Sequence, residues 1–270
     1  MSETRIRIIS ALIIAPFVVA CFVSYKSLVG LVSSIVLLAS AELFFSTLMR
    51  YKRIGIVILY TSLVSIFPIL YGLWFINRPV ELLSSIFIIA MTLTLFTIKD
   101  KNKVMEFYGI FLIALVYISM NLSFFIPLYM KHGAAVALLT LTLSWAYDSF
   151  AYFFGISFGK HKLPSIYSPN KSYEGLIGGI LGTIIYTIIY FMIINRFFDY
   201  NLPYWYSLVF GIITGIFDTF GDLFESSIKR AYDLKHMGNF MPGHGGMFDR
   251  IDGLLFVAPV IYIFLEFMSK

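Results

Sequence analysis

Long apolar stretches, separated by short polar connectors, occupy most of this chain. A helix needs about 20 apolar residues to cross the hydrocarbon core of a bilayer. The stretches are continuous rather than alternating, which favours helices over barrel strands. The pattern therefore predicts an all-α, polytopic integral membrane protein with about nine transmembrane helices. The predicted spans are residues 8–25, 29–48, 54–75, 82–98, 108–130, 134–158, 176–198, 206–228 and 253–269.

The composition agrees with a membrane protein and excludes two soluble classes. Hydrophobic residues make up 59% of the 270 residues and charged residues 13%, whereas a soluble domain carries about 25% charged residues. The single cysteine, Cys21, excludes a disulfide scaffold. A net charge of +5 would suggest nucleic acid for a soluble chain. Here the basic residues are better explained as topology markers and phosphate contacts, so no nucleic-acid partner is expected.

Lysine and arginine are unevenly distributed between the two sides of the nine-span arrangement. Fifteen of the 20 lie at the N-terminus or in the connectors after the even-numbered spans. The other five are Lys26, Arg78, Lys131, Arg196 and Lys270. Because short basic connectors stay on the cytoplasmic side, the distribution predicts a cell-membrane protein (inner or plasma membrane). Its N-terminus and the connectors at residues 159–175 and 229–252 are expected in the cytoplasm, and its C-terminus outside.

Polar residues that could bind a ligand or take part in a reaction concentrate in the second half of the chain. We expect residues 1–133 to form about five N-terminal spans, whose role the sequence does not indicate. Residues 134–270 are expected to form the catalytic region, with motif loops at 159–175 and 229–252.

Five acidic residues fall inside predicted spans, where an ionised carboxylate costs about 2.5–3.5 kcal/mol at the helix centre. They are Glu42, Asp148, Asp218, Asp222 and Glu225. The last three, together with Lys229, are spaced i, i+4, i+7 and i+11, which places them on one helix face. That face is expected to line a polar cavity or bind a cation, and a salt-bridge network between helices is the alternative. Glu42 is isolated, and we interpret it as a packing or interfacial residue.

The connector after residue 228 combines glycines, acids and basic residues. Gly243, His244, Gly245 and Gly246 form a backbone that can approach phosphate oxygens closely. Asp249 and Asp252 stand three residues apart and, with Asp218 and Asp222, make an all-oxygen set that suits Mg²⁺. The positive charge that complements a polyphosphate comes from Lys229, Arg230, Lys235 and Arg250.

Two segments carry a specific resemblance to a known family. One comprises Gly221-Asp222-Leu223, Glu225-Ser226, Lys229-Arg230, Lys235, Pro242-Gly243-His244-Gly245-Gly246 and Asp249-Arg250-Ile251-Asp252. The other comprises Asp148-Ser149-Phe150-Ala151-Tyr152, Gly155, Gly159-Lys160, Ser168-Pro169-Asn170-Lys171 and Glu174-Gly175. Together they resemble the CDP-diglyceride synthases (phosphatidate cytidylyltransferases) over about residues 148–262. His236 stands where that family usually has Asp, so no required carboxylate is expected there.

The resemblance implies transfer of CMP from CTP to phosphatidic acid, giving CDP-diacylglycerol and pyrophosphate in phospholipid biosynthesis. It also implies dependence on a divalent cation, Mg²⁺, with room for a second cation. The expected metal ligands are Asp218, Asp222, Asp249 and Asp252. The expected catalytic residues are Asp222, Asp249, Lys229, Arg230, His244 and Arg250. The expected substrate-binding residues are Lys171, Ser226, Lys235, Gly243, Gly245 and Gly246.

Two other functions use similar ingredients. A cation-coupled membrane transporter also carries intramembrane acids and glycine-interrupted helices, but no pseudo-symmetric second half is visible in the sequence. A CTP-dependent lipid-alcohol kinase would move the γ-phosphate of CTP instead of its CMP. The expected partners are CTP, phosphatidic acid and the lipid bilayer, and the sequence leaves a homodimer open.

Overall fold

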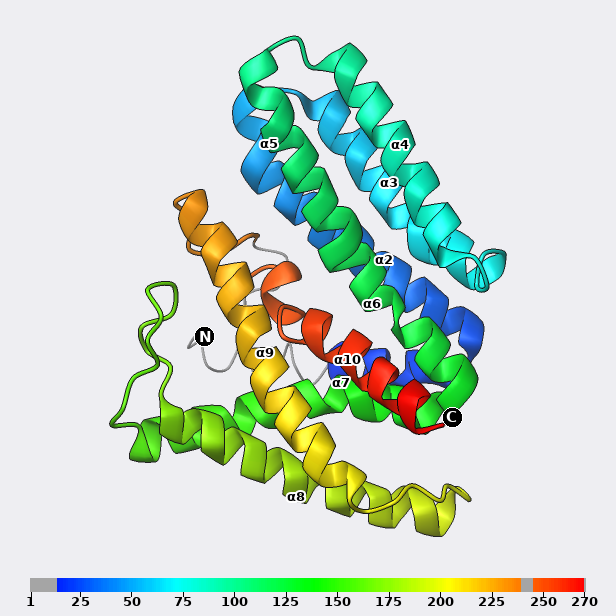
Figure 1. The fold of residues 1–270 in the computed structure, drawn as a ribbon, viewed down its shortest axis with the longest axis vertical. Helices are drawn as coiled ribbons and strands as arrows, with labels where there is room; N and C mark the ends of the chain where they lie inside the picture. The colour runs from blue at the N-terminus through cyan, green and yellow to red at the C-terminus, as the bar shows by residue number, and fades with distance from the viewer. Residues whose placement is uncertain (1–13, 239–244, 270) are drawn as a thin grey trace. The chain divides into compact units, whose positions relative to one another are not determined.

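The computed structural model describes residues 14–238 and 245–269 and is all-α, as predicted. The first part contains η1 (Cys21–Val23), α2 (Tyr25–Leu48), η2 (Met49–Tyr51), α3 (Ile54–Leu73), α4 (Pro79–Thr97), α5 (Lys101–Leu112), η3 (Ile113–Met120) and α6 (Asn121–Ser123). The remainder contains α7 (Phe125–Phe158), α8 (Tyr173–Phe197), α9 (Tyr206–Ala231), η4 (Phe248–Arg250) and α10 (Leu254–Met268). Within these residues there is no strand, and the β-type pairing found is one bridge between Lys162 and Ser172. Figure 1 shows the course of the helices.

Seven helices within residues 14–238 are long and apolar enough to cross a membrane. They are Tyr25–Tyr51, Ile54–Leu73, Pro79–Thr97, Lys101–His132, Ala134–Phe158, Tyr173–Phe197 and Tyr206–Ala231. Each overlaps one predicted span, from the second to the eighth.

The first and ninth predicted spans coincide with shorter helices, Ile14–Val23 and Leu254–Met268. Residues 8–13 of the first span lie outside the described residues. The last helix, α10, is short because the residues before it form the 3₁₀ turn η4 and a further turn. Fifteen residues extend about 22 Å, less than the roughly 30 Å of a hydrocarbon core.

The chain divides into two compact units. The first contains the described residues of Met1–Met130 together with Leu234–Ile251, and the second contains Lys131–Asp233 and Asp252–Lys270. The described residues of the motif-bearing segment, 234–238 and 245–251, therefore belong with the helices of the first half of the chain. The division of function between residues 1–133 and 134–270 stays a prediction.

Antiparallel helices form the first unit, in which α2 packs on α3, α3 on α4 and α4 on α5. Aromatic rings fill the space between them, with Tyr60 stacked edge-on against Phe111 at 4.8 Å between ring centroids. The hydroxyl of Tyr60 hydrogen-bonds with that of Thr94, which satisfies both groups inside an apolar core. Ser119, in the π-helical η3, donates to the carbonyl of Val64 on α3 at 2.9 Å.

Glycines set the helix spacing in the second unit. Gly178 and Gly182 on α8 face aromatic side chains of α7, where an added Cβ would overlap Phe154 and Phe150 respectively. Gly211 and Gly215 on α9 leave room in the same way for isoleucines of α8. The small residues spaced four apart therefore serve close helix packing.

A helix break separates Lys101–His132 from Ala134–Phe158. Gly133 has φ +86° and ψ 167°, a conformation that side-chain-bearing residues rarely adopt. A Cβ at this position would also overlap the hydroxyl of Tyr200. Gly133 therefore ends one span and begins the next, at the boundary the sequence predicts.

Candidate functional site

Three carboxylates meet beside α9 in the second unit. Oxygens of Asp222, Glu225 and Asp252 all lie within 4.8 Å of one another. Asp222 and Glu225 share a face of α9 because they are three residues apart, and Asp252 lies in the turn before α10. We call these three residues the acidic cluster. Its all-oxygen donor set suits a hard divalent cation.

Two glycines permit the close approach of α9 to the turn that carries Asp252. A Cβ added at Gly221 would overlap the Asp252 carbonyl oxygen, and one at Gly253 would overlap the carboxylate of Asp218. Either side chain would push the turn away from α9. Gly221 and Gly253 therefore allow the backbones of α9 and the turn to approach closely enough for the acidic cluster to form.

Basic side chains partly neutralise the acidic cluster. The ammonium of Lys171, from the loop before α8, lies 2.5 Å from a carboxylate oxygen of Asp222. Lys229 forms an ion pair with Glu225 one turn away on α9. Ser226 donates to the other oxygen of Asp222 at 3.3 Å. Two lysines expected to contact phosphate are thus paired with carboxylates of the acidic cluster.

Two of the acids on α9, Asp218 and Glu225, are deeply buried. Asp218 is 3% exposed and Glu225 fully buried, and among the described residues Oδ1 of Asp218 has no hydrogen-bond partner. Burial, reinforced by the charges of Asp222 and Asp148, raises the pKa of the Asp252 carboxyl to about 7. A bound cation would relieve this concentration of negative charge. The acidic cluster therefore fits a divalent metal ion, and the expected roles of Asp218, Asp222 and Asp252 as its ligands stay predictions.

Asp249 belongs to the first unit, where it organises its own loop. Its Oδ2 accepts the N–H of Gly246 at 2.9 Å and the N–H of Met237 at 3.2 Å. Gly245, the residue before Gly246, has a left-handed backbone with φ +85°. A Cβ there would meet both Oδ2 of Asp249 and the ring of His236. One carboxylate oxygen of Asp249 therefore has a structural role in the loop, and its expected role beside Asp222 stays a prediction.

Glu42 contacts this same loop although the two are far apart in the sequence. Its Oε1 accepts the N–H of Met247 and its Oε2 the N–H of Phe248, both at 2.9 Å. Gly246 and Gly238 lie so close to the carboxylate that a Cβ at either would overlap it. Glu42 is therefore not isolated: its packing role is a specific contact that holds the motif loop against α2. No periodicity reveals a contact between residues 205 positions apart.

The remaining expected site residues lie at the surface or outside the described part. Arg230, Lys235 and Arg250 are exposed and form no ion pair with any described residue. Gly243 and His244 lie outside the described residues. Glu225, which we had not placed among the metal ligands, enters the acidic cluster; its spacing from Asp222 was the available signal.

The fold and the cluster together define a class: an α-helical chain with membrane-length helices and a carboxylate-lysine site suited to phosphate and cation chemistry. Comparison with known proteins makes this specific. The model of the cytidylyltransferase family matches residues 5–268. The chain belongs to this family.

Curated relatives extend over much or all of the chain. The phosphatidate cytidylyltransferase of Thermotoga maritima is 47% identical over 270 residues, covering 100% of this chain and 98% of its own length. The phosphatidate cytidylyltransferase of Bacillus subtilis is 35% identical over 188 residues, 68% of each chain. That of Staphylococcus haemolyticus is 35% identical over 184 residues, 68% of this chain and 69% of its own.

Proposed function

We propose that this protein is a phosphatidate cytidylyltransferase, which transfers CMP from CTP to phosphatidic acid. The products are CDP-diacylglycerol and pyrophosphate, and the reaction serves phospholipid biosynthesis. Full-length similarity to the Thermotoga maritima enzyme supports this function. The observation that carries it in the structure is the acidic cluster with its two paired lysines.

A phosphate oxygen of phosphatidic acid attacks the α-phosphorus of CTP, and the bond from that phosphorus to the bridging oxygen of the β-phosphate breaks. The electron pair leaves with pyrophosphate, so the protein needs no nucleophile of its own. Positioning and charge stabilisation carry such transfers. This chemistry explains why the site consists of carboxylates and basic side chains and needs no serine or cysteine nucleophile.

Mg²⁺ is the proposed cofactor, with Asp222 and Asp249 as its principal ligands and Asp218 and Asp252 supporting it or a second cation. Glu225 joins this group because it lies in the acidic cluster. When bound, the ion neutralises charge on the triphosphate and on the leaving pyrophosphate.

The paired lysines act on substrate phosphates. Lys171 forms an ion pair with Asp222, and Lys229 forms one with Glu225. Phosphate oxygens of an arriving substrate compete for the same ammonium groups, which then hold phosphate beside the carboxylates. Arg230, Lys235 and Arg250, together with the loop of Gly243, His244, Gly245 and Gly246, complete the proposed phosphate contacts. Ser226 orients Asp222 through its hydrogen bond.

The number of spans and the orientation of the chain in the membrane are also part of the proposal. Seven apolar helices and bacterial relatives indicate a cell-membrane protein. We propose that the two shorter helices complete nine spans, that the N-terminus and motif loops face the cytoplasm, and that the C-terminus faces outward. The distribution of basic residues supports this orientation. A homodimer is compatible with this arrangement, and residues 134–270 are the proposed catalytic region.

Labelled CTP tests the reaction directly. Purified protein in detergent is incubated with Mg²⁺ and phosphatidic acid, using CTP labelled at the α- or the γ-phosphate in parallel. The proposal predicts label in lipid from α-labelled CTP and none from γ-labelled CTP. Transfer of γ-label to a lipid alcohol would instead establish a kinase, and absence of lipid label from both would reject the transferase.

A further inference from the structure

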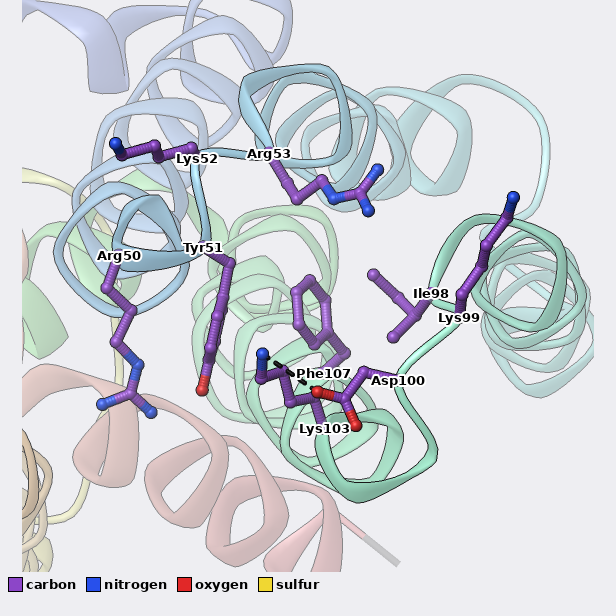
Figure 2. Close-up of a pocket in the computed structure, with 9 residues that line it drawn as sticks. All are labelled: Arg50, Tyr51, Lys52, Arg53, Ile98, Lys99, Asp100, Lys103 and Phe107. Atoms are coloured by element: carbon purple, nitrogen blue, oxygen red, sulfur yellow. Dashed lines mark ion pairs between the residues drawn. The ribbon is translucent and has the colours of Figure 1, made fainter.

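A basic pocket lies at one end of the first unit, among residues that neither motif segment supplies. Figure 2 shows the pocket, which has a volume of about 300 Å³. It is lined by Arg50, Tyr51, Lys52, Arg53, Ile98, Lys99, Asp100, Lys103 and Phe107. These residues come from η2, the connector between η2 and α3, the connector between α4 and α5, and α5 itself. Its volume is at the lower end for ligand pockets, which suits a headgroup.

Five basic side chains and one acid line this pocket, and two of the basic ones are already paired. Lys103 pairs with Asp100 at 3.0 Å, and Arg50 pairs with Glu106. Asp100 also accepts the N–H of Asn102 as the N-cap of α5. Asp100 and Glu106 are therefore both paired with basic side chains of the same unit.

Three basic side chains at the pocket form no ion pair with any other described residue, so their charge is not neutralised by a neighbouring acid. They are Lys52, Arg53 and Lys99, and all three are exposed. Figure 2 shows the Arg53 side chain extending toward Ile98 and Phe107, with Lys52 and Lys99 extending outward at the rim. The pocket is therefore electropositive.

The floor and the backbone of the pocket favour an anionic headgroup over a freely hydrated counter-ion. Phe107 and Ile98 are buried at 1% and 8% exposure, which gives an apolar floor. Lys52 holds a left-handed backbone with φ 54° between η2 and α3. Arg53 provides no side-chain cap for α3, so the first N–H groups of that helix add positive potential nearby.

The position of the pocket identifies the source of the anion. The two connectors that line the pocket join the ends of four helices long and apolar enough to cross a membrane. Their polar ends therefore lie where hydrocarbon gives way to headgroups, and basic pockets between spans at that level bind anionic lipid headgroups. We propose that this pocket binds the phosphate headgroup of an anionic phospholipid of the surrounding membrane.

The test compares lipid binding to charge variants of the full-length protein. Native mass spectrometry of protein in neutral detergent measures the Kd for phosphatidylglycerol, with phosphatidylcholine as the zwitterionic reference. Removing two charges with Arg53→Gln and Lys99→Gln is expected to weaken phosphatidylglycerol binding about thirtyfold. The matched control, Lys101→Gln with Lys160→Gln, removes two exposed lysines outside the pocket and should change the Kd less than about threefold. Both pairs are exposed, so folding is preserved.

Three results would overturn the proposal. Equal weakening by both double variants would show general electrostatic attraction to basic connectors. An unchanged Kd in the Arg53 and Lys99 double variant would place lipid binding elsewhere. Displacement of phosphatidylglycerol by an equal concentration of glycerol phosphate or pyrophosphate, with the same dependence on Arg53, would identify a soluble phosphate compound as the occupant. The measurement does not involve cytidylyl transfer, so its outcome is independent of the proposed reaction.

Discussion

Replacing Glu42 with glutamine should loosen the motif loop and slow the reaction. The carboxylate accepts one N–H at each oxygen, from Met247 and from Phe248, both at 2.9 Å. A glutamine of nearly the same size keeps one carbonyl acceptor and presents an amide N–H₂ to the other donor. One hydrogen bond to a charged acceptor is therefore lost, and a buried N–H is left facing a donor.

The magnitude follows from the hydrogen bonds. A bond to a charged group contributes about 1.5–3 kcal/mol, so losing one shifts the loop toward displaced conformations by about 10- to 150-fold. Because Asp249 lies one residue beyond Phe248, a displaced loop also misplaces this expected metal ligand. We expect cytidylyl transfer to fall by at most this factor, with less change in thermal stability than a core cavity would cause.

Hydrogen exchange and activity are measured together. Exchange of the Met247 and Phe248 amides should accelerate in Glu42→Gln, because these amides lose an acceptor. The matched control is Glu81→Gln, an exposed acid in the first turn of α4, which should leave both exchange and activity unchanged. Unchanged amide protection together with wild-type activity in Glu42→Gln would refute this reasoning.

Two further predictions concern the loop and the topology. His236 lies beside Gly245 and Asp249 but is not an expected metal ligand, so His236→Ala should keep most activity and His236→Asp should also be active. An alanine variant that folds normally but is inactive would contradict this. In a variant with Cys21 replaced, a cysteine at Lys235 should resist an impermeant reagent added outside sealed cells, whereas one at Arg78 should react. Labelling of the Lys235 position from outside would reject the cytoplasmic orientation.

Features that depend on local spacing could be predicted from the sequence, and those that depend on long-range contacts could not. The i, i+4, i+7 spacing places Asp218, Asp222 and Glu225 on one face of α9, and their burial is confirmed for Asp218 and Glu225. Hydropathy located the break near Gly133 because an apolar stretch ends there.

No spacing or hydropathy pattern in the sequence indicates the contact of Glu42 with the motif loop. A buried carboxylate that binds backbone N–H groups places no demand on the identity of its partners, and Met247 and Phe248 give no sign of it in the sequence. The pairing of Lys171 with Asp222 was missed for a related reason, since both lysine and acid had been assigned to substrate or cation. The length of α10 depends on the turns before it, which hydropathy does not detect.

The most direct test of the central claim is the initial rate of label transfer from α-labelled CTP to phosphatidic acid in three variants. Asp222→Asn and Asp249→Asn preserve size but remove the charge that a hard cation requires. Each should lower the rate to about 1% or less, and the double variant should fall little further, because residues acting as one unit are not additive. The control Asp199→Asn alters an exposed acid with left-handed backbone that asparagine tolerates, and it should keep the wild-type rate. Full activity of Asp222→Asn at ordinary Mg²⁺ concentration, in protein of normal thermal stability, would contradict the account.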